Sequence, residues 1–171
     1  MTTSIVLLRG VNLGARNRIA MADLRALLED LGCTDVRTHL ASGNAVVGTR
    51  RSPASLEEAV AEALADRGLP VAVMVRTADE LAQVVRDCPW EGLDPQRLQA
   101  AFLSGEPDPA AVAAIAHEAL LPERVHVGER VLYLDQAPGI RNSKLNALRL
   151  GVQATARNWR TVLGLHALAS G

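Results

Sequence analysis

The spacing of apolar residues alternates between two periods along the first half of the chain, and each period predicts a different element. The apolar run at residues 3–9 predicts a buried strand, whereas leucines spaced by three and four over 21–31 predict a helix. Residues 35–40 and 45–49 predict two further strands, which flank the sequence SGN at 42–44, typical of a hairpin turn. The chain is therefore expected to begin with a strand, a helix and a hairpin.

A second helix and a fourth strand complete the pattern of this half. The helix is expected to open at Ser55, which has the spacing of a capping box with Glu58, and to end near Arg67. Residues 70–76 predict a strand, and a linking helix with its own capping pair follows over 77–86. The resulting order, β-α-β-β-α-β, is the ferredoxin-like order.

The same order of elements restarts after a loop at 88–97 that is rich in Pro, Gly and acidic residues. Residues 99–104 predict a strand, and the Asp-Pro pair at 108–109 predicts a helix with proline at its first position. Residues 123–127 and 130–134 predict a second hairpin, with its turn at Gly128 and Glu129.

Two helices are expected to end the chain. The first covers about 143–150 and has Ser143 or Asn142 as its cap, and the second covers about 155–168 and has Thr155 as its cap. We therefore predict an α+β fold made of two ferredoxin-like (βαββαβ-type) halves with extra C-terminal helices. The first half, with its linking helix, is expected to span residues 1–87, and the second half 98–171.

Composition argues against several classes of protein. Aromatic residues make up 2% of the chain, which offers little for stacking the bases of a single strand. No run of 18 apolar residues exists, so no membrane span is expected. Cys33 and Cys88 have no motif spacing and are most simply free thiols, which indicates a cytoplasmic protein.

The formal net charge of −1 conceals an uneven distribution. Residues 1–52 carry 7 arginines against 4 acids, residues 53–138 carry 6 against 15, and residues 139–171 carry 5 basic residues and no acid. If the two basic segments meet in space, they form a positive site on an acidic body. Such a site favours a defined anionic ligand over unspecific binding along a polyanion.

Lysine and asparagine are distributed in the same uneven way. Lys144 is the only lysine, against 17 arginines, and the stretch 45–141 holds neither residue type. Lysine differs from arginine because its amine is compact and can lose its proton, so Lys144 is a candidate reactive group. The alternative is a surface lysine in the first turn of a helix, where the dipole disfavours a cation.

Two loops in the first half carry candidate ligand-binding residues. Arg9, Asn12 and Asn17 belong to a Gly- and Arg-rich loop that leads from a strand into a helix, an arrangement that suits anions. Ser42 and Asn44 lie at the hairpin tip, which one end of a ferredoxin-like sheet could bring near that loop. Both loops also have a purely structural interpretation as tight turns.

The last helix supplies the remaining candidates. Arg157 and Arg160 are three residues apart and would share one helix face, where they could hold a phosphate or carboxylate, with Asn158 between them. Trp159 is expected in the core. The four histidines show neither metal-ligand spacing nor a triad pattern, and no cofactor loop is recognisable, so catalysis stays an open question.

Four stretches together resemble one bacterial family, the uncharacterised DUF1697 family. They are LLRGVNLGARNRIAMADLR at 7–25, HLASGNAVV at 39–47, SKL at 143–145 and ATARNWRTV at 154–162, in the family's order. The resemblance implies a two-part α+β fold and no established activity. His39, Ala41 and Gly164 stand where the family usually has Tyr, Gln and Lys.

We therefore expect a cytoplasmic protein that binds a small anionic ligand, such as a nucleotide, between its two halves. Two alternatives stay open. A nucleic-acid binder is permitted by the basic segments but disfavoured by the scarce aromatics and the acidic middle, and a protein-interaction module would need no small ligand at all.

Overall fold

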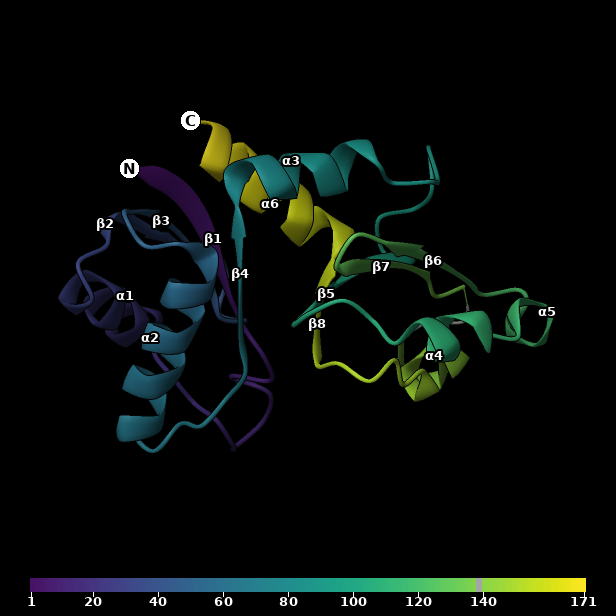
Figure 1. Cartoon of the computed structure of the whole chain (residues 1–171), viewed down its shortest axis with the longest axis horizontal. Coiled ribbons are helices and arrows are strands. Elements are labelled where there is room, and N and C mark those ends of the chain that lie inside the picture. The colour runs from purple at the N-terminus through teal and green to yellow at the C-terminus, as the bar shows by residue number, and fades with distance from the viewer. Residues whose placement is uncertain (138–139) are drawn as a thin grey trace. The chain divides into compact units, whose positions relative to one another are not determined.

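The first of two units contains a four-stranded sheet, and its strands and helices follow one another in the predicted order. A computed structural model describes residues 1–137 and 140–171, and the chain divides into a first unit, residues 1–83 with 163–171, and a second unit, residues 84–162 (Figure 1). The elements of the first unit are β1 (Thr2–Leu8), α1 (Met21–Asp30), β2 (Thr34–Thr38), β3 (Asn44–Thr49), α2 (Pro53–Asp66) and β4 (Val73–Thr77).

Every strand pair in this sheet is antiparallel, in the order β2-β3-β1-β4. Ser4 of β1 lies opposite Val47 on one side and Thr77 on the other. One face of the sheet is covered by α1 and α2, because Val6, Leu8 and Val47 form a buried cluster with the apolar faces of both helices (Figure 1). This arrangement is the ferredoxin-like one that the sequence predicts.

Helix α2 begins earlier than its expected capping box. Ser52 is the N-cap, its hydroxyl accepts from Ser55 N at 3.2 Å, and Pro53 occupies the first helical position. The predicted cap at Ser55 is therefore wrong. The helix begins three residues earlier because Pro53 suits the first helical position: its φ is already helical, and the N–H that it lacks would have no partner within the helix. The predicted pair at Thr77 and Glu80 is confirmed by reciprocal bonds of 2.7 and 3.1 Å.

Helix α3 (Ala78–Arg86) leads into the second unit, whose sheet repeats the same topology. Its strands are β5 (Leu98–Leu103), β6 (Arg124–Gly128), β7 (Val131–Asp135) and β8 (Ala154–Asn158), in the order β6-β7-β5-β8. Its helical segments are α4 (Pro109–Ala113), α5 (His117–Leu120) and two 3-10 turns, η1 (Ile140–Asn142) and η2 (Lys144–Ala147). Helix α6 (Trp159–Ser170) follows β8.

The predicted helix at 155–168 is wrong in its first turn. Residues 154–158 form strand β8, in which Thr155 lies opposite Phe102 and Arg157 opposite Ala100, so Thr155 is not a helix cap. Pairing with β5 outweighs the helical tendency of these alanines, as tertiary context often does. The predicted helix at 143–150 is the single turn η2, and Ser143 caps it as expected.

The two antiparallel sheets confirm the predicted α+β class and the ferredoxin-like halves. Only one of the two expected C-terminal α-helices is present among the described residues. Residues 163–171, which include the second part of α6, belong to the first unit, whereas the sequence-based boundaries placed the whole helix in the second half.

Candidate anion site around the first loop

The loop between β1 and α1 is organised by one asparagine. Asn12 has a φ of 56°, a left-handed conformation that asparagine tolerates better than most residues. Its Oδ1 accepts from Ile19 N at 2.9 Å, and its Nδ2 donates to Ile19 O at 2.9 Å and to Ala41 O at 2.6 Å. The side chain therefore ties both the far end of the loop and the hairpin tip to the end of β1.

Asn17 has a similar role within the loop. It also has a positive φ, 52°, and its carbonyl accepts from Asn12 N at 2.9 Å, while its Nδ2 donates to Gly10 O at 3.4 Å. Arg9 precedes this turn as an exposed residue whose backbone N–H donates to Ala72 O at 2.9 Å. The side-chain amides of both asparagines thus fix the backbone conformation of this loop through hydrogen bonds.

The hairpin tip packs directly on the first loop. Gly43 has a φ of 79°, and a Cβ there would lie 2.6 Å from Val11 Cγ2 and 2.8 Å from Leu8 Cβ, so no larger residue fits. Asn44 is fully buried, and its Nδ2 donates to His39 O at 2.9 Å and to Ser42 Oγ at 2.8 Å. The structure brings the two predicted loops together, as the sheet topology led us to expect.

Two hollows adjoin this loop and share Arg18, Ile19 and Ala20. The loop pocket, of about 360 Å³, is lined by Asn12, Gly14, Arg18, Ile19, Ala20, Met21 and Ala41. The helix groove, of about 450 Å³, is lined by Arg18, Ile19, Ala20, Asp23, Ala26, Leu27, Leu64, Arg67 and Leu69. Of the residues predicted to bind ligand, Asn12 lines the loop pocket, and Arg9, Asn17, Ser42 and Asn44 do not.

The loop pocket has a positive character. Arg18 donates from Nε to Gly14 O at 3.1 Å, which fixes the plane of its guanidinium. Helix α1 starts at the pocket with Ala20 as its N-cap, and no side chain caps its first N–H groups. Asp23 in the first turn is the opposing charge, and it lines the helix groove rather than the loop pocket.

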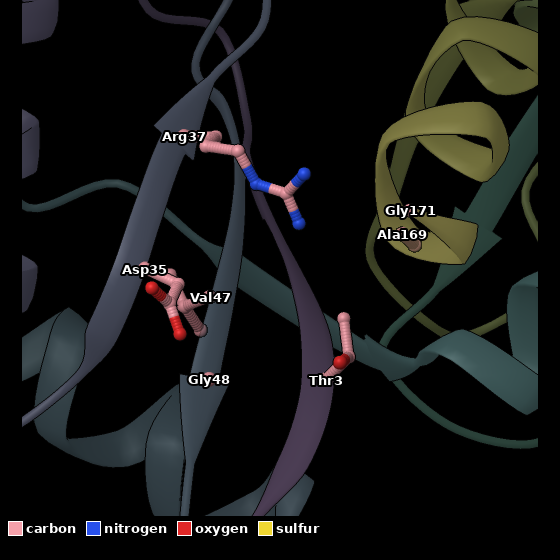
Figure 2. A pocket seen from close by; sticks show the side chains of 7 residues that line it. All are labelled: Thr3, Asp35, Arg37, Val47, Gly48, Ala169 and Gly171. Atoms are coloured by element: carbon pink, nitrogen blue, oxygen red, sulfur yellow. The ribbon is translucent and has the colours of Figure 1, made fainter.

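A third hollow in the first unit is lined by residues of strands β1, β2 and β3 and of the C-terminal end of the chain. Thr3, Asp35, Arg37, Val47, Gly48, Ala169 and Gly171 line about 510 Å³. Figure 2 shows the guanidinium of Arg37 extending from β2 toward the end of α6, with the carboxylate of Asp35 two residues away on the same strand. Its two opposite charges distinguish this hollow from the loop pocket.

The lone lysine anchors a turn in the second unit. Lys144 Nζ donates to Ala119 O at 2.9 Å, and its backbone N–H donates to Glu123 Oε1 at 2.8 Å. Glu123, which is 1% exposed, also accepts from the hydroxyl of Ser143 through Oε2. The segment that contains Lys144 therefore satisfies a buried carboxylate, and the ammonium itself lies at the surface.

The RNW segment lies elsewhere in this unit. Arg157 is 7% exposed on β8, and its Nη1 donates to Thr155 Oγ1 at 2.6 Å and to Ala156 O at 2.9 Å. Burial lowers the pKa of the Arg157 guanidinium to about 10. Asn158 Oδ1 accepts from Arg160 N at 2.9 Å, so the amide supports the start of α6 while the Arg160 side chain is exposed.

Lys144 and Arg157 are not brought together within the second unit. Arg157 lies opposite Ala100, whereas Ala101, the next residue of β5, belongs to the buried cluster that includes Leu145. Because successive residues of a strand point to opposite faces, Arg157 and the Leu145 cluster lie on opposite faces of the sheet. The expected sharing of one helix face by Arg157 and Arg160 also fails, since Arg157 is in a strand.

The strongest ion-pair network was not predictable from sequence spacing. Asp135 is fully buried and contacts Arg97 Nη2 at 2.9 Å and Arg124 Nη2 at 2.8 Å, and Arg124 lies 4.7 Å from the centre of the Trp90 ring. These residues are far apart in the chain, and no local motif marks them. Arg18 lines both hollows. It belongs to the Arg-rich loop noted in the sequence, but nothing in the sequence distinguishes it from the other arginines of that loop.

Two of the positions that depart from the family pattern touch each other. A Cβ built on Gly164 would lie 2.6 Å from His39 Nε2 and 2.9 Å from His39 Cε1, so a side chain at 164 would require the imidazole to move. The imidazole and the glycine therefore fit each other as a pair.

The described part of the chain holds no group of three His, Cys, Asp or Glu residues placed to bind a metal ion. Within the same residues, no helix is both long enough and apolar enough to cross a bilayer.

Comparisons with known proteins agree with this fold. Among solved structures, the chain is similar to conserved bacterial protein SP0830 from Streptococcus pneumoniae, with a TM-score of 0.80 and 22% identity over 98% of each chain. That identity supports a shared fold alone. No curated protein matches the chain. Residues 1–133 match DUF1697, a protein family of unknown function. Because this match covers most of the sequence, the chain belongs to the DUF1697 family.

Proposed function

We propose that this protein binds a small ligand bearing a phosphate or carboxylate group, and that the anionic group occupies the loop pocket of the first unit. The observation that carries the proposal is the position of Arg18, which lines both hollows and has its guanidinium plane fixed by the bond to Gly14 O. A guanidinium can fork onto the two oxygens of such a group.

The rigidity of the loop supports the proposal. The three bonds of the Asn12 side chain hold the pocket wall in place before any ligand arrives, so little ordering is left for binding to induce. The start of α1 adds a partial positive charge, since no side chain caps its N–H groups. A local positive charge on an ordered wall suits a defined anion.

The residues predicted from the sequence divide into two groups under this proposal. Asn12 and Asn44 organise the loop and the hairpin tip through their hydrogen bonds. Arg9, Asn17 and Ser42 are exposed in the same two loops. Arg9 can contribute longer-range attraction for an anion, and the other two can contact a larger ligand. Lys144, Arg157, Asn158 and Arg160 belong to the second unit, and their part in binding stays a prediction.

The test is a thermal-shift comparison of the intact protein with Arg18→Gln and Arg25→Gln. Arg25 is an exposed arginine of α1 that lines neither hollow, so it controls for the loss of one charge. Phosphate, pyrophosphate and acetate are added at constant ionic strength, because salt screens surface charges. A ligand that binds the folded state raises the melting temperature by mass action.

We expect at least one of these anions to raise the melting temperature of the wild type and of Arg25→Gln, and to have little effect on Arg18→Gln. Equal shifts in all three proteins would contradict the proposal, as would the absence of any shift in the wild type.

A further inference from the structure

We infer that the ligand of this site is an amphipathic anion, a single anionic head with an alkyl chain, whose head lies at Arg18 and whose chain lies in the helix groove. This inference rests on the proposed function, since it assigns the rest of the ligand to the second of the two adjoining hollows.

Continuity between the hollows is the first support. Arg18, Ile19 and Ala20 line both, so a ligand held in the loop pocket has the helix groove directly beside it. The groove, of about 450 Å³, lies within the usual size range of small-molecule sites.

The lining of the groove is the second support. Six of its residues are apolar: Ile19, Ala20, Ala26, Leu27, Leu64 and Leu69. Leu27 and Leu64 are close-packed members of the core beneath it, so the floor is rigid. The arginines at 18 and 67 carry apolar stems that can cover a chain while their charged ends stay in water.

The charges decide which part of the ligand lies in which hollow. Asp23 lines the helix groove but not the loop pocket, so an anionic head in the groove would meet a carboxylate. Arg67, which also lines the groove, already donates from Nη1 to Ala63 O at 2.9 Å, and its Nη2 lies 3.7 Å from Asp30 Oδ2. The head is therefore placed at Arg18 in the loop pocket, and the uncharged part of the ligand in the groove.

The test measures affinity along a series of straight-chain carboxylates from acetate to decanoate, below the concentrations at which they form micelles. Each added methylene that enters the groove should tighten binding by about fourfold, until the groove is full. Alcohols of the same chain lengths, which lack the anionic head, should bind at least tenfold more weakly than the acids.

A variant that fills the groove sharpens the test. Ala26 is exposed on α1 and lines the groove, so Ala26→Phe should occupy it without disturbing the core. Ala54 is an exposed alanine of α2 that lines neither hollow, and Ala54→Phe is the matched control. We expect Ala26→Phe to abolish the dependence on chain length and to keep the binding of acetate or phosphate, and Ala54→Phe to change neither.

The outcomes separate the two proposals. If acetate or phosphate binds through Arg18 but affinity does not increase with chain length, the amphipathic ligand is excluded and the anion site stands. If affinity increases with chain length equally in wild type and in Ala26→Phe, the chain lies outside the groove and the inference fails. If neither phosphate, pyrophosphate nor any acid of the series binds, both proposals fail.

Discussion

The two sheets of this protein have the same strand order, and the segments that cover them are very different. In the first unit, α1 and α2 have 10 and 14 residues and bury a continuous apolar cluster. In the second unit, the corresponding positions hold α4 and α5, of 5 and 4 residues, and the turns η1 and η2. The same topology is thus compatible with long helices and with short turns.

The difference determines what stabilises each unit. Long helices bury a continuous apolar face, as the core under α1 and α2 shows. Short turns bury less, and the second unit also uses two buried carboxylates, Glu123 and Asp135, that tie loops to its sheet. The comparison also locates the candidate site, since the hollows form beside the long loop 9–20 and the helices of the first unit.

Removal of the Asp135 carboxylate should have the largest effect on stability. Asp135→Ala leaves Arg97 and Arg124 without their shared partner, and we expect a loss of about 3 kcal/mol, moderated because both arginines are about 40% exposed and can be hydrated. Urea unfolding measures the change. Glu91→Ala, at an exposed acid of the neighbouring loop, is the control, and an equal loss in both variants would contradict the role of the network.

Loss of the loop asparagine should come next. Asn12→Ala removes three hydrogen bonds and places alanine at a positive φ, so we expect a loss of about 2 kcal/mol and weaker binding of any anion in the loop pocket. Asn17→Gly should change stability by less than about 0.5 kcal/mol, because glycine adopts positive φ without strain. Similar effects of the two substitutions would show that the bonds of Asn12 contribute little.

The substitution Glu123→Gln tests whether the carboxylate of Glu123 holds the turn η2 in place. Gln at 123 keeps the shape but offers only one accepting oxygen to the Ser143 hydroxyl and the Lys144 N–H, so we expect a loss of about 1.5 kcal/mol. Hydrogen exchange at the Leu145 amide should accelerate. Glu118→Gln, at an exposed acid of α5, should leave that exchange rate unchanged, and unchanged exchange in Glu123→Gln would refute the anchoring role.

Lys144→Ala should have the smallest effect. The ammonium makes one surface hydrogen bond, to Ala119 O, so its loss should change stability by less than about 0.5 kcal/mol. The variant should also retain any melting-temperature increase caused by phosphate, pyrophosphate or acetate. A ligand effect that disappears in Lys144→Ala, with stability unchanged, would transfer the site from Arg18 to the lysine.

The sequence predicts the fold much better than the site. Apolar periodicity identifies the strands and helices of the first unit because each buries a regular face, as with the leucines of α1. The same reasoning fails at 154–158, where a short strand rich in alanine shows no clear period and is specified by its partner β5. For short elements, the tertiary partner supplies the information that local sequence lacks.

The candidate residues illustrate a second limit. The asparagine distribution drew attention to Asn12 and Asn44 as ligand-binding candidates. Both amides bond to backbone atoms, a role that looks the same in sequence as ligand binding. The proposed role of Arg18 follows from the two hollows that it lines, one of which involves residues as distant in sequence as Leu64 and Leu69. Such a surface cannot be read from local spacing.

The central claim, an anion site at Arg18, is tested most directly by mapping amide chemical shifts during a titration with phosphate. The account predicts saturable changes at Gly14, Ala20 and Met21, which line the loop pocket, and their loss in Arg18→Gln. Changes confined to the second unit, or changes in the loop that persist in Arg18→Gln, would contradict it.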